Sequence, residues 1–255
     1  MRLFLACAYT YANRLDESLK FRSKYVLESY FYLKSKKRAI EMIKQHKYKH
    51  FMLDSGAFTY LAQQNNGNNI SVDWDEYLDG YISFINRMNI DEFFELDIDN
   101  VVGLKKVEEM RFRLERETHK RCIPVWHFGR GKEYYIKMCK EYDYIAFGGI
   151  ITDGIPNKEI LRYLPWFTET AHKYGCKVHG LGVTCKGIEK YGLDSVDSTT
   201  WLSGSRFGQI AQFDGTRVKN VARASLIGKR VYNAKGLDAH NFNEWLKYQA
   251  WLEKF

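Results

Sequence analysis

Short apolar segments alternate with amphipathic ones along most of the chain, and this alternation constrains the fold more than any other feature. The segments expected to form strands are residues 2–8, 50–58, 92–99, 121–129, 144–149, 177–184, 194–199 and 205–213. Most of them are continuously apolar, which is typical of parallel strands covered by helices. Eight such units in 255 residues predict an α/β fold, a (β/α)8 TIM barrel, with residues 1–255 forming a single domain.

The segments between these strands supply the covering layer. Helical spacing appears in residues 24–46, 73–88, 103–119, 132–142, 157–175 and 186–192, and residues 240–255 predict a closing helix. Pro165 predicts a kink or a boundary in the fifth of these. A doubly wound open sheet is the alternative architecture. The chain has no GxGxxG after the first strand and no GxxxxGK[ST], so a nucleotide-binding open sheet would lack its usual marks.

Polar residues gather where the predicted strands end. Of the six middle strands, five end in Asp or His and the other ends in a glycine pair. Active sites of barrels lie at the carboxyl ends of the strands, so these side chains are predicted to share one mouth. In chain order they are Asp54 with Ser55 and Gly56, Asp97, His127, Gly148 with Gly149, His179 with Gly180, and Asp197.

Three aspartates at one mouth can do two kinds of chemistry. Their oxygens can bind a divalent metal ion. They can also divide the work of nucleophile, acid and base in glycosidic chemistry, where one carboxylate attacks C1′ and another handles protons. Aspartate is also common in caps and turns, but capping alone does not readily concentrate three aspartates at strand ends.

The net charge of +8 is unevenly distributed. Residues 1–50 hold 12 Lys and Arg against 4 Asp and Glu, and the remaining residues hold 27 of each. Tyrosine and phenylalanine are interleaved with this basic segment, which suits a polyanion whose bases can stack. A solvated helix face over an aromatic core is the other interpretation. The candidates for nucleic-acid contact are Lys34, Lys36, Lys37, Arg38 and Arg206.

Cysteine usage and hydropathy bear on the cellular setting. The five cysteines are scattered, and no pair has the spacing of metal ligands, which predicts reduced thiols and a cytoplasmic protein. No apolar run reaches the roughly 18 residues that a membrane helix needs. We expect the N-terminal segment to be a strand and not a signal peptide.

Six motifs occur in an order that matches a known family. They are "LDSGAFT" (53–59), "LDID" (96–99), "IPVWHFG" (123–129), "FGGI" (147–150), "HGLGVT" (179–184) and "GLDSVDSTTW" (192–201). Together they resemble the tRNA-guanine transglycosylase superfamily, most closely the small phage and bacterial branch that inserts 7-deazaguanines into DNA. The resemblance implies a (β/α)8 barrel that exchanges guanine for a 7-deazaguanine, such as 7-cyano-7-deazaguanine, through a covalent enzyme–nucleotide intermediate and without a cofactor.

The resemblance also implies roles for individual residues. Asp197 falls on the family's nucleophile, Asp54 on its general acid/base and Asp97 on its purine-recognising aspartate. A shift of one motif would make Asp194 the nucleophile; otherwise Asp194 has a supporting role. The other strand-end residues are then expected to bind the base; they are Ser55, Gly56, His127, Gly148, Gly149, His179 and Gly180. Among them, His127 stands where the family has a glutamine, and an imidazole can still donate one hydrogen bond.

The chain departs from the tRNA enzymes after the seventh predicted strand. Those enzymes carry a Cys-x-Cys-x-x-Cys run with a distant His, whereas the last cysteine here is Cys185. We therefore expect no zinc subdomain and favour DNA as the partner, in a host cytoplasm if a phage encodes the chain. Three alternatives stay open: an enzyme acting on tRNA, a catalytically silent barrel that binds nucleic acid, and an unrelated metal-dependent barrel hydrolase.

Overall fold

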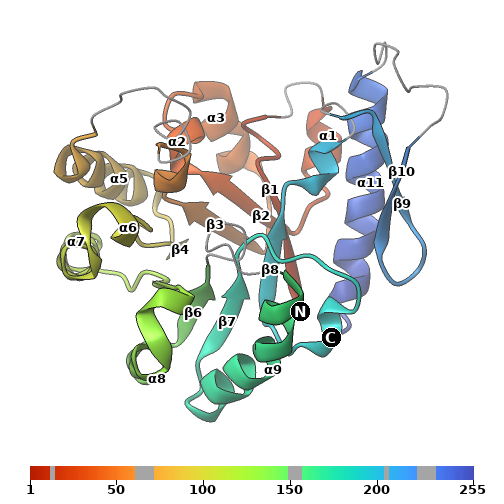
Figure 1. Cartoon of the computed structure of the whole chain (residues 1–255). Helices are drawn as coiled ribbons and strands as arrows, with labels where there is room; N and C mark the ends of the chain where they lie inside the picture. Colours follow the sequence, from red (N-terminus) through yellow and green to blue (C-terminus); the bar gives the residue numbers. More distant parts are fainter. Residues whose placement is uncertain (12–14, 61–71, 149–156, 204–206, 223–233) are drawn as a thin grey trace.

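A ring of parallel strands dominates the computed structural model (Figure 1), which describes residues 1–11, 15–60, 72–148, 157–203, 207–222 and 234–255. The strand order is β4-β3-β2-β1-β8-β7-β6-β5, and every pair within this sheet is parallel. The strands are β1 Arg2–Ala6, β2 Tyr25–Ser29, β3 His50–Asp54, β4 Glu92–Phe93, β5 Val125–Trp126, β6 Tyr144–Phe147, β7 Lys177–Gly180 and β8 Ser195–Ser198.

The two end strands of this sheet also meet. A parallel bridge joins Phe94 to Ile123, just beyond β4 and just before β5. The Ile123 N–H donates to the Phe93 carbonyl at 2.8 Å, and the Glu95 N–H donates to the Ile123 carbonyl at 3.1 Å. The strands therefore follow one another around a ring in chain order, and the predicted TIM-barrel architecture is confirmed.

One strand of the ring lies where the sequence predicted helix. Residues 24–46 were expected to be a single helix, but Tyr25–Ser29 form β2, fully buried between β1 and β3. Helices α2 (Tyr30–Leu33) and α3 (Lys37–Gln45) follow it. The apolar part of β2, Tyr25–Leu27, is too short to have a periodicity of its own, so the helical pattern that follows it also accommodates these residues.

The segment predicted as the eighth strand lies outside the ring. β9 (Gln209–Phe213) pairs antiparallel with β10 (Val218–Ala222) in a separate two-stranded sheet. This hairpin packs along α11 (Ala234–Leu252), as Figure 1 shows. The Ala211 N–H donates to Asn241 Oδ1 at 2.8 Å, and the Phe213 N–H donates to Glu244 Oε2 at 2.8 Å. β9 therefore lies outside the ring because it pairs with β10 and bonds to α11, and not with β1.

Helices cover the outside of the ring. Among the helices of the described residues are α1 Glu17–Lys20, α5 Trp74–Met88, α6 Asp99–Val102, α7 Leu104–Thr118, α8 Gly131–Glu141 and α9 Asn157–Lys173. α9 continues through Pro165, so the proline does not end the helix. The predicted helix at 186–192 is one short 3₁₀ turn, Ile188–Lys190. In the described part of the chain, no helix is both long and apolar enough to span a membrane.

Two apolar layers stabilise the barrel, one inside the ring and one between the strands and the helices. Side chains alternate between these layers along each strand, and this alternation determines which way the strand-end residues point. A small cluster fills the inside of the ring, including Phe4, Ala6, Leu27 and Met52, and a larger cluster lies between strands and helices. Side chains two positions apart on a strand share a face. Because Met52 points inward, Asp54 at the end of the same strand points toward the barrel axis.

Candidate active site

Asp54 is fixed by the tight turn that follows β3. The Gly56 N–H donates to Asp54 Oδ2 at 3.1 Å. Gly56 has φ +72°, and a Cβ there would lie 2.4 Å from the Phe31 Cβ. Only glycine fits this backbone and this close approach. The "DSG" turn therefore sets the carboxylate of Asp54 through one backbone hydrogen bond.

The carboxyl group of Asp54 titrates near neutrality. Burial and the negative charges of Asp197 and Asp97 raise the pKa of Asp54 to about 7, against the opposing hydrogen bond from Gly56. Both neighbouring aspartates thus lie close enough to act on Asp54 electrostatically. A carboxyl with a pKa near the operating pH can both give and take a proton.

Asp197 lies at the end of β8 and is held by two groups. Its Oδ1 accepts a hydrogen bond of 2.7 Å from the Gly182 N–H and lies 3.3 Å from His179 Nε2. The other ring nitrogen of His179, Nδ1, lies 2.5 Å from Ser195 Oγ. Asp197 keeps 9% exposure. Its carboxylate is thus oriented from below and still reachable from the mouth.

This arrangement corrects the expectation for His179. The imidazole is 0% exposed, and its ring packs against Phe4 and Phe94 inside the barrel. It lies beneath Asp197 and presents no surface to a base. Alternation along β7 places this side chain inside the ring, one layer below the strand end. His179 therefore supports Asp197 and does not line the mouth.

Asp97 and His127 form a pair on the opposite side of the ring. His127 Nε2 lies 2.5 Å from Asp97 Oδ1. Burial disfavours the imidazolium, but the hydrogen bond and charge of Asp97 outweigh it and raise the pKa of His127 above its usual value. The side chain of Asp97 keeps 24% exposure. Asp97 can therefore meet a ligand while His127 holds one of its oxygens.

The glycines have mainly structural reasons to be where they are. The Gly148 N–H donates to the Trp126 carbonyl at 2.9 Å, so it is not free for a base as expected. A Cβ on Gly148 would lie 2.6 Å from Val125 Cγ1 and 3.0 Å from His127 Cε1. One on Gly180 would lie 3.1 Å from Val183. Gly149 lies outside the described residues.

Ser55 and Asp194 also differ from simple expectation. Ser55 is 1% exposed, and its carbonyl accepts a hydrogen bond from the Tyr77 hydroxyl at 2.5 Å. Asp194 precedes β8, where its Oδ2 accepts from the Val178 N–H at 2.8 Å and lies 2.9 Å from His172 Nε2. This is the amino end of the strands, so Asp194 lies on the face of the barrel opposite Asp197.

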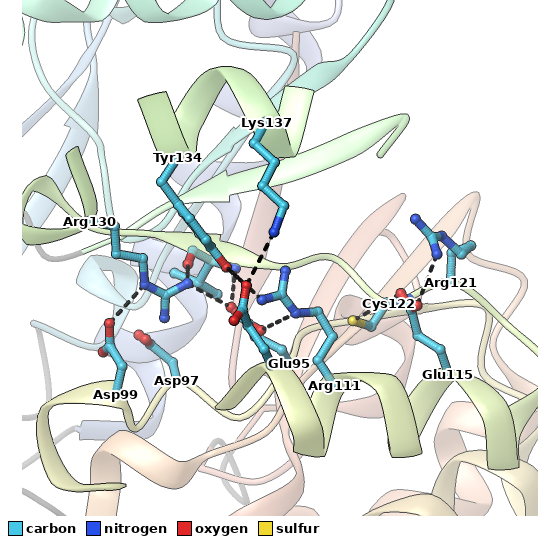
Figure 2. Close-up of polar contacts among 12 residues, drawn as sticks. Glu95, Asp97, Asp99, Arg111, Glu115, Arg121, Cys122, Arg130, Tyr134 and Lys137 are labelled. Atoms are coloured by element: carbon cyan, nitrogen blue, oxygen red, sulfur yellow. Dashed lines mark hydrogen bonds and ion pairs between the residues drawn. The ribbon is translucent and has the colours of Figure 1, made fainter. Parts of the chain in front are cut away.

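A buried ion-pair network beside Asp97 was not found from sequence (Figure 2). Glu95 is 0% exposed and lies 3.2 Å from Arg130 Nη1 and 3.1 Å from Arg111 Nε. Arg130 Nε also donates to Asp99 Oδ2 at 2.7 Å. The available signal was a glutamate flanked by Phe94 and Leu96, since a charge inside an apolar strand needs a buried partner.

Glu28 is a second missed carboxylate, because β2 was predicted as helix. It accepts hydrogen bonds of 2.7 Å from the Tyr9 N–H and from the Thr10 hydroxyl. Burial raises the pKa of Glu28 to about 7, and these two hydrogen bonds oppose the shift. Glu28 thereby orders the loop that follows β1, next to the mouth.

One group of side chains has the arrangement of metal ligands. Within the described chain, Asp97, Asp99 and His127 offer three ligand atoms within 4.8 Å of one another. Two carboxylates and an imidazole suit Mn²⁺, Fe²⁺ or Zn²⁺. Arg130 already neutralises Asp99, as Figure 2 shows, and a metal ion would have to compete with it.

The basic side chains of the N-terminal segment divide into two groups. Lys34 covers a set of aromatic rings, 5.0 Å from the Tyr77 ring centre and 5.8 Å from that of Tyr60. Lys36, Lys37 and Arg38 are exposed around the start of α3. Arg206 lies outside the described residues.

Comparison with known proteins shows the fold and a viral relative. No protein-family model matches the chain. "Uncharacterized protein 306" of Sulfolobus islandicus rod-shaped virus 1 is 31% identical over 175 residues, 65% of this chain and 53% of that protein. The chain therefore spans about half the length of this curated relative.

Solved structures resemble the chain in fold alone. A protein described as a fructose-1,6-biphosphate aldolase from Coccidioides immitis has a TM-score of 0.53 at 10% identity, covering 99% of this chain and 88% of that chain. The carboxyl transferase domain of Rhizobium etli pyruvate carboxylase has a TM-score of 0.48 at 13% identity, covering 99% and 47%. The first of these supports a TIM-barrel-like α/β fold.

Proposed function

We propose that this protein is a guanine transglycosylase that exchanges guanine in DNA for a 7-deazaguanine. One observation carries the proposal: Asp54 and Asp197 end two strands of the same barrel, interact electrostatically, and differ in environment. The ordered motifs of the transglycosylase superfamily supply the substrate class.

Each carboxyl group suits one part of the reaction. Asp197 is oriented by the Gly182 N–H and by His179, which leaves its second oxygen to attack C1′. Asp54, with a pKa of about 7, is partly protonated at neutral pH and can protonate a leaving base. The exposed carboxylate edge of Asp97 can accept hydrogen bonds from the N–H groups of a purine.

The reaction is a double displacement at C1′. A carboxylate oxygen of Asp197 bonds to C1′ as the bond from C1′ to guanine N9 breaks, and Asp54 gives its proton to the departing guanine. The incoming 7-deazaguanine then loses its N9 proton to Asp54 and bonds to C1′, which releases Asp197. Two inversions give net retention, and the proton on Asp54 is restored.

DNA is the proposed polynucleotide because the chain lacks the cysteine run of the tRNA enzymes. In a duplex, the target guanine would have to be flipped out or already unpaired to reach Asp197. The exposed cations Lys34, Lys36, Lys37 and Arg38 supply attraction for the backbone. Reversing these four charges should weaken DNA binding and reduce the dependence of the affinity on salt concentration. If the affinity and its salt dependence were both unchanged, the four side chains would only form a solvated helix face.

Isotope exchange tests the proposal directly. The protein is incubated with labelled 7-cyano-7-deazaguanine and either guanine-containing DNA or tRNA, and label in the polynucleotide is counted. We expect label in DNA and a covalent protein–DNA species on a denaturing gel. Label in tRNA alone would favour the tRNA enzyme. Binding without label would favour a catalytically silent barrel.

A metal-dependent hydrolase is the second candidate, favoured by the cluster of Asp97, Asp99 and His127. It predicts hydrolysis of a substrate only with added divalent metal, and metal binding that Asp99→Asn weakens. The exchange reaction needs no metal in the scheme above. Exchange that persists in chelator would therefore separate the two functions.

A further inference from the structure

A cavity with basic walls lies between α1 and the start of α3. It has a volume of about 1030 Å³, and four cationic side chains line it: Lys20, Lys36, Lys37 and Arg38. Of its two acidic side chains, Glu17 is paired with Arg38 at 2.7 Å. The volume is at the upper end of the range for small-molecule sites. The lining thus has an excess of positive charge and space for a nucleotide-sized group.

The first turn of α3 contributes backbone donors to this cavity. The N–H groups of Lys37, Arg38 and Ala39 find no acceptor among the described residues. Lys36 caps the helix without a side-chain hydrogen bond, and the first turn has no acidic residue. No residue of α3 itself therefore compensates the positive end of the helix dipole, which is the arrangement that binds anions elsewhere.

Lys20 gives an independent indication of a ligand. It is 3% exposed, yet it lines the cavity. Within the described chain its ammonium has no hydrogen-bond acceptor and no carboxylate within 4.0 Å, and it lies 5.7 Å from the centre of the Tyr9 ring. Two opposite charges, those of Glu28 and Glu17, act on Lys20. Both oxygens of Glu28 already accept other hydrogen bonds, and Glu17 is paired with Arg38. Among the residues that the structure describes, the ammonium thus has a cation–π contact with Tyr9 but no hydrogen-bonded anion, and the side chain has little contact with solvent. An anion in the cavity would offset the cost of holding this charge away from water.

We propose that this cavity binds a phosphate group, held by the backbone N–H groups at the start of α3 and by the ammonium of Lys20. That the phosphate belongs to a DNA strand rests on the proposed function. The cavity and the carboxylates share one face of the barrel, because α3 follows the carboxyl end of β2. Tyr9, two residues beyond Cys7, lines the cavity. Burial and then the charges of Glu28, Asp54 and Asp197 raise the pKa of Cys7, so the segment that follows β1 adjoins both the cavity and the carboxylates.

Two probes test the site without any need for exchange activity. Inorganic phosphate is titrated by calorimetry, and a labelled single-stranded guanine-containing oligonucleotide is titrated by anisotropy at several salt concentrations. Lys20→Met should weaken both by about tenfold or more and reduce the salt slope for DNA by about one. Lys173→Met is the matched control: this exposed lysine ends α9 at the opposite face, and we expect no change.

A second variant covers the case in which Lys20→Met does not fold. Lys37→Glu changes an exposed side chain in the first turn of α3 and should weaken both probes as well. Wild-type affinity for phosphate in a folded Lys20→Met protein would overturn the site. Loss of phosphate binding with unchanged DNA binding would overturn its place on the DNA path. Intact binding of both probes by a protein that never exchanges a base would contradict the proposed function and leave the phosphate site supported.

Discussion

Two regions at the carboxyl end of the barrel contain carboxylates of the same kind in opposite electrostatic settings. In the first, Asp54 and Asp197 have no cationic Lys or Arg partner within 4.0 Å among the described residues. In the second, Asp99 contacts the guanidinium of Arg130 at 2.7 Å. Burial acts on both, but the hydrogen bond and charge of Arg130 outweigh it and lower the pKa of Asp99.

This difference in electrostatic setting separates a carboxyl that can take part in catalysis, Asp54, from one that supports the structure, Asp99. A carboxyl that keeps its proton to about pH 7 can exchange that proton with a substrate. A carboxylate paired with a buried arginine stays ionised, so it holds neighbouring groups in position and does not exchange a proton. Glu95 and Asp99 flank Asp97 in the sequence, and Figure 2 shows Asp99 and its partner Arg130 beside Asp97, so the network can fix the loop that presents Asp97.

The largest expected effect is loss of the nucleophile. Asp197→Asn keeps the shape of the side chain and removes the charge that attacks C1′. We expect exchange to fall at least about 10⁴-fold and the covalent protein–DNA species to disappear, while DNA binding is retained. Exchange assays and denaturing gels measure both.

Asp194→Asn is the control for this variant, because Asp194 lies on the other face of the barrel. It should keep exchange activity and the adduct, with at most some loss of stability. Loss of the adduct in Asp194→Asn with retention in Asp197→Asn would move the nucleophile three residues back and contradict the scheme.

Removing the proton donor should have a smaller effect on exchange. Asp54→Asn should lower turnover about 10²–10⁴-fold, while an adduct still forms slowly because guanine departure is helped by a proton but does not strictly require one. In the wild type, Asp54 is protonated below its pKa of about 7, so guanine release should fall as pH rises above about 7. Asp54→Asn should lose this dependence. Identical pH profiles for the two proteins would exclude Asp54 as the acid.

The strand-end residues were predictable, and their supporting contacts were not. Asp54, Asp97 and Asp197 end apolar runs, and a parallel barrel brings such ends to one mouth whatever the details. His179 shows the limit: whether an inward-facing polar side chain near a strand end meets the ligand or lies one layer below depends on a difference of two residues in where the strand ends.

The failure at β2 had a larger consequence. A short apolar strand next to a helix carries no separate period, so the ring was completed with residues 205–213 instead of Tyr25–Ser29. Glu28 was missed with it. Arg130 and Glu95 were missed because their pairing is long range, and single-sequence patterns report only local spacing.

Removing the charge of Glu95 from the arginine-paired region should lower the free energy of unfolding of the protein. Glu95→Gln would leave Arg111 and Arg130 buried without their shared counter-charge, and we expect a loss of about 3 kcal/mol in the free energy of unfolding. Urea denaturation measures it. Glu108→Gln, a partly exposed neighbour in the same network, is the control and should cost less than about 1 kcal/mol. Equal effects of the two variants would contradict the central role of Glu95.

The last expected effect has the opposite sign and concerns Asp54, which has no arginine partner among the described residues. The native carboxyl of Asp54 keeps its proton up to a pKa of about 7, whereas its usual value is 3.8. Between these values the native state binds more protons than the unfolded state, so stability falls as pH rises from about 4 to 7. Asp54→Asn removes this cost. At about 1.4 kcal/mol per pKa unit, we expect the variant to gain up to about 4 kcal/mol over the wild type at pH 8 and to lose this advantage at pH 4, by urea denaturation at both. A variant less stable than the wild type at pH 8 would mean that the ionised carboxylate is favoured in the folded protein, and the contrast with Asp99 would fail.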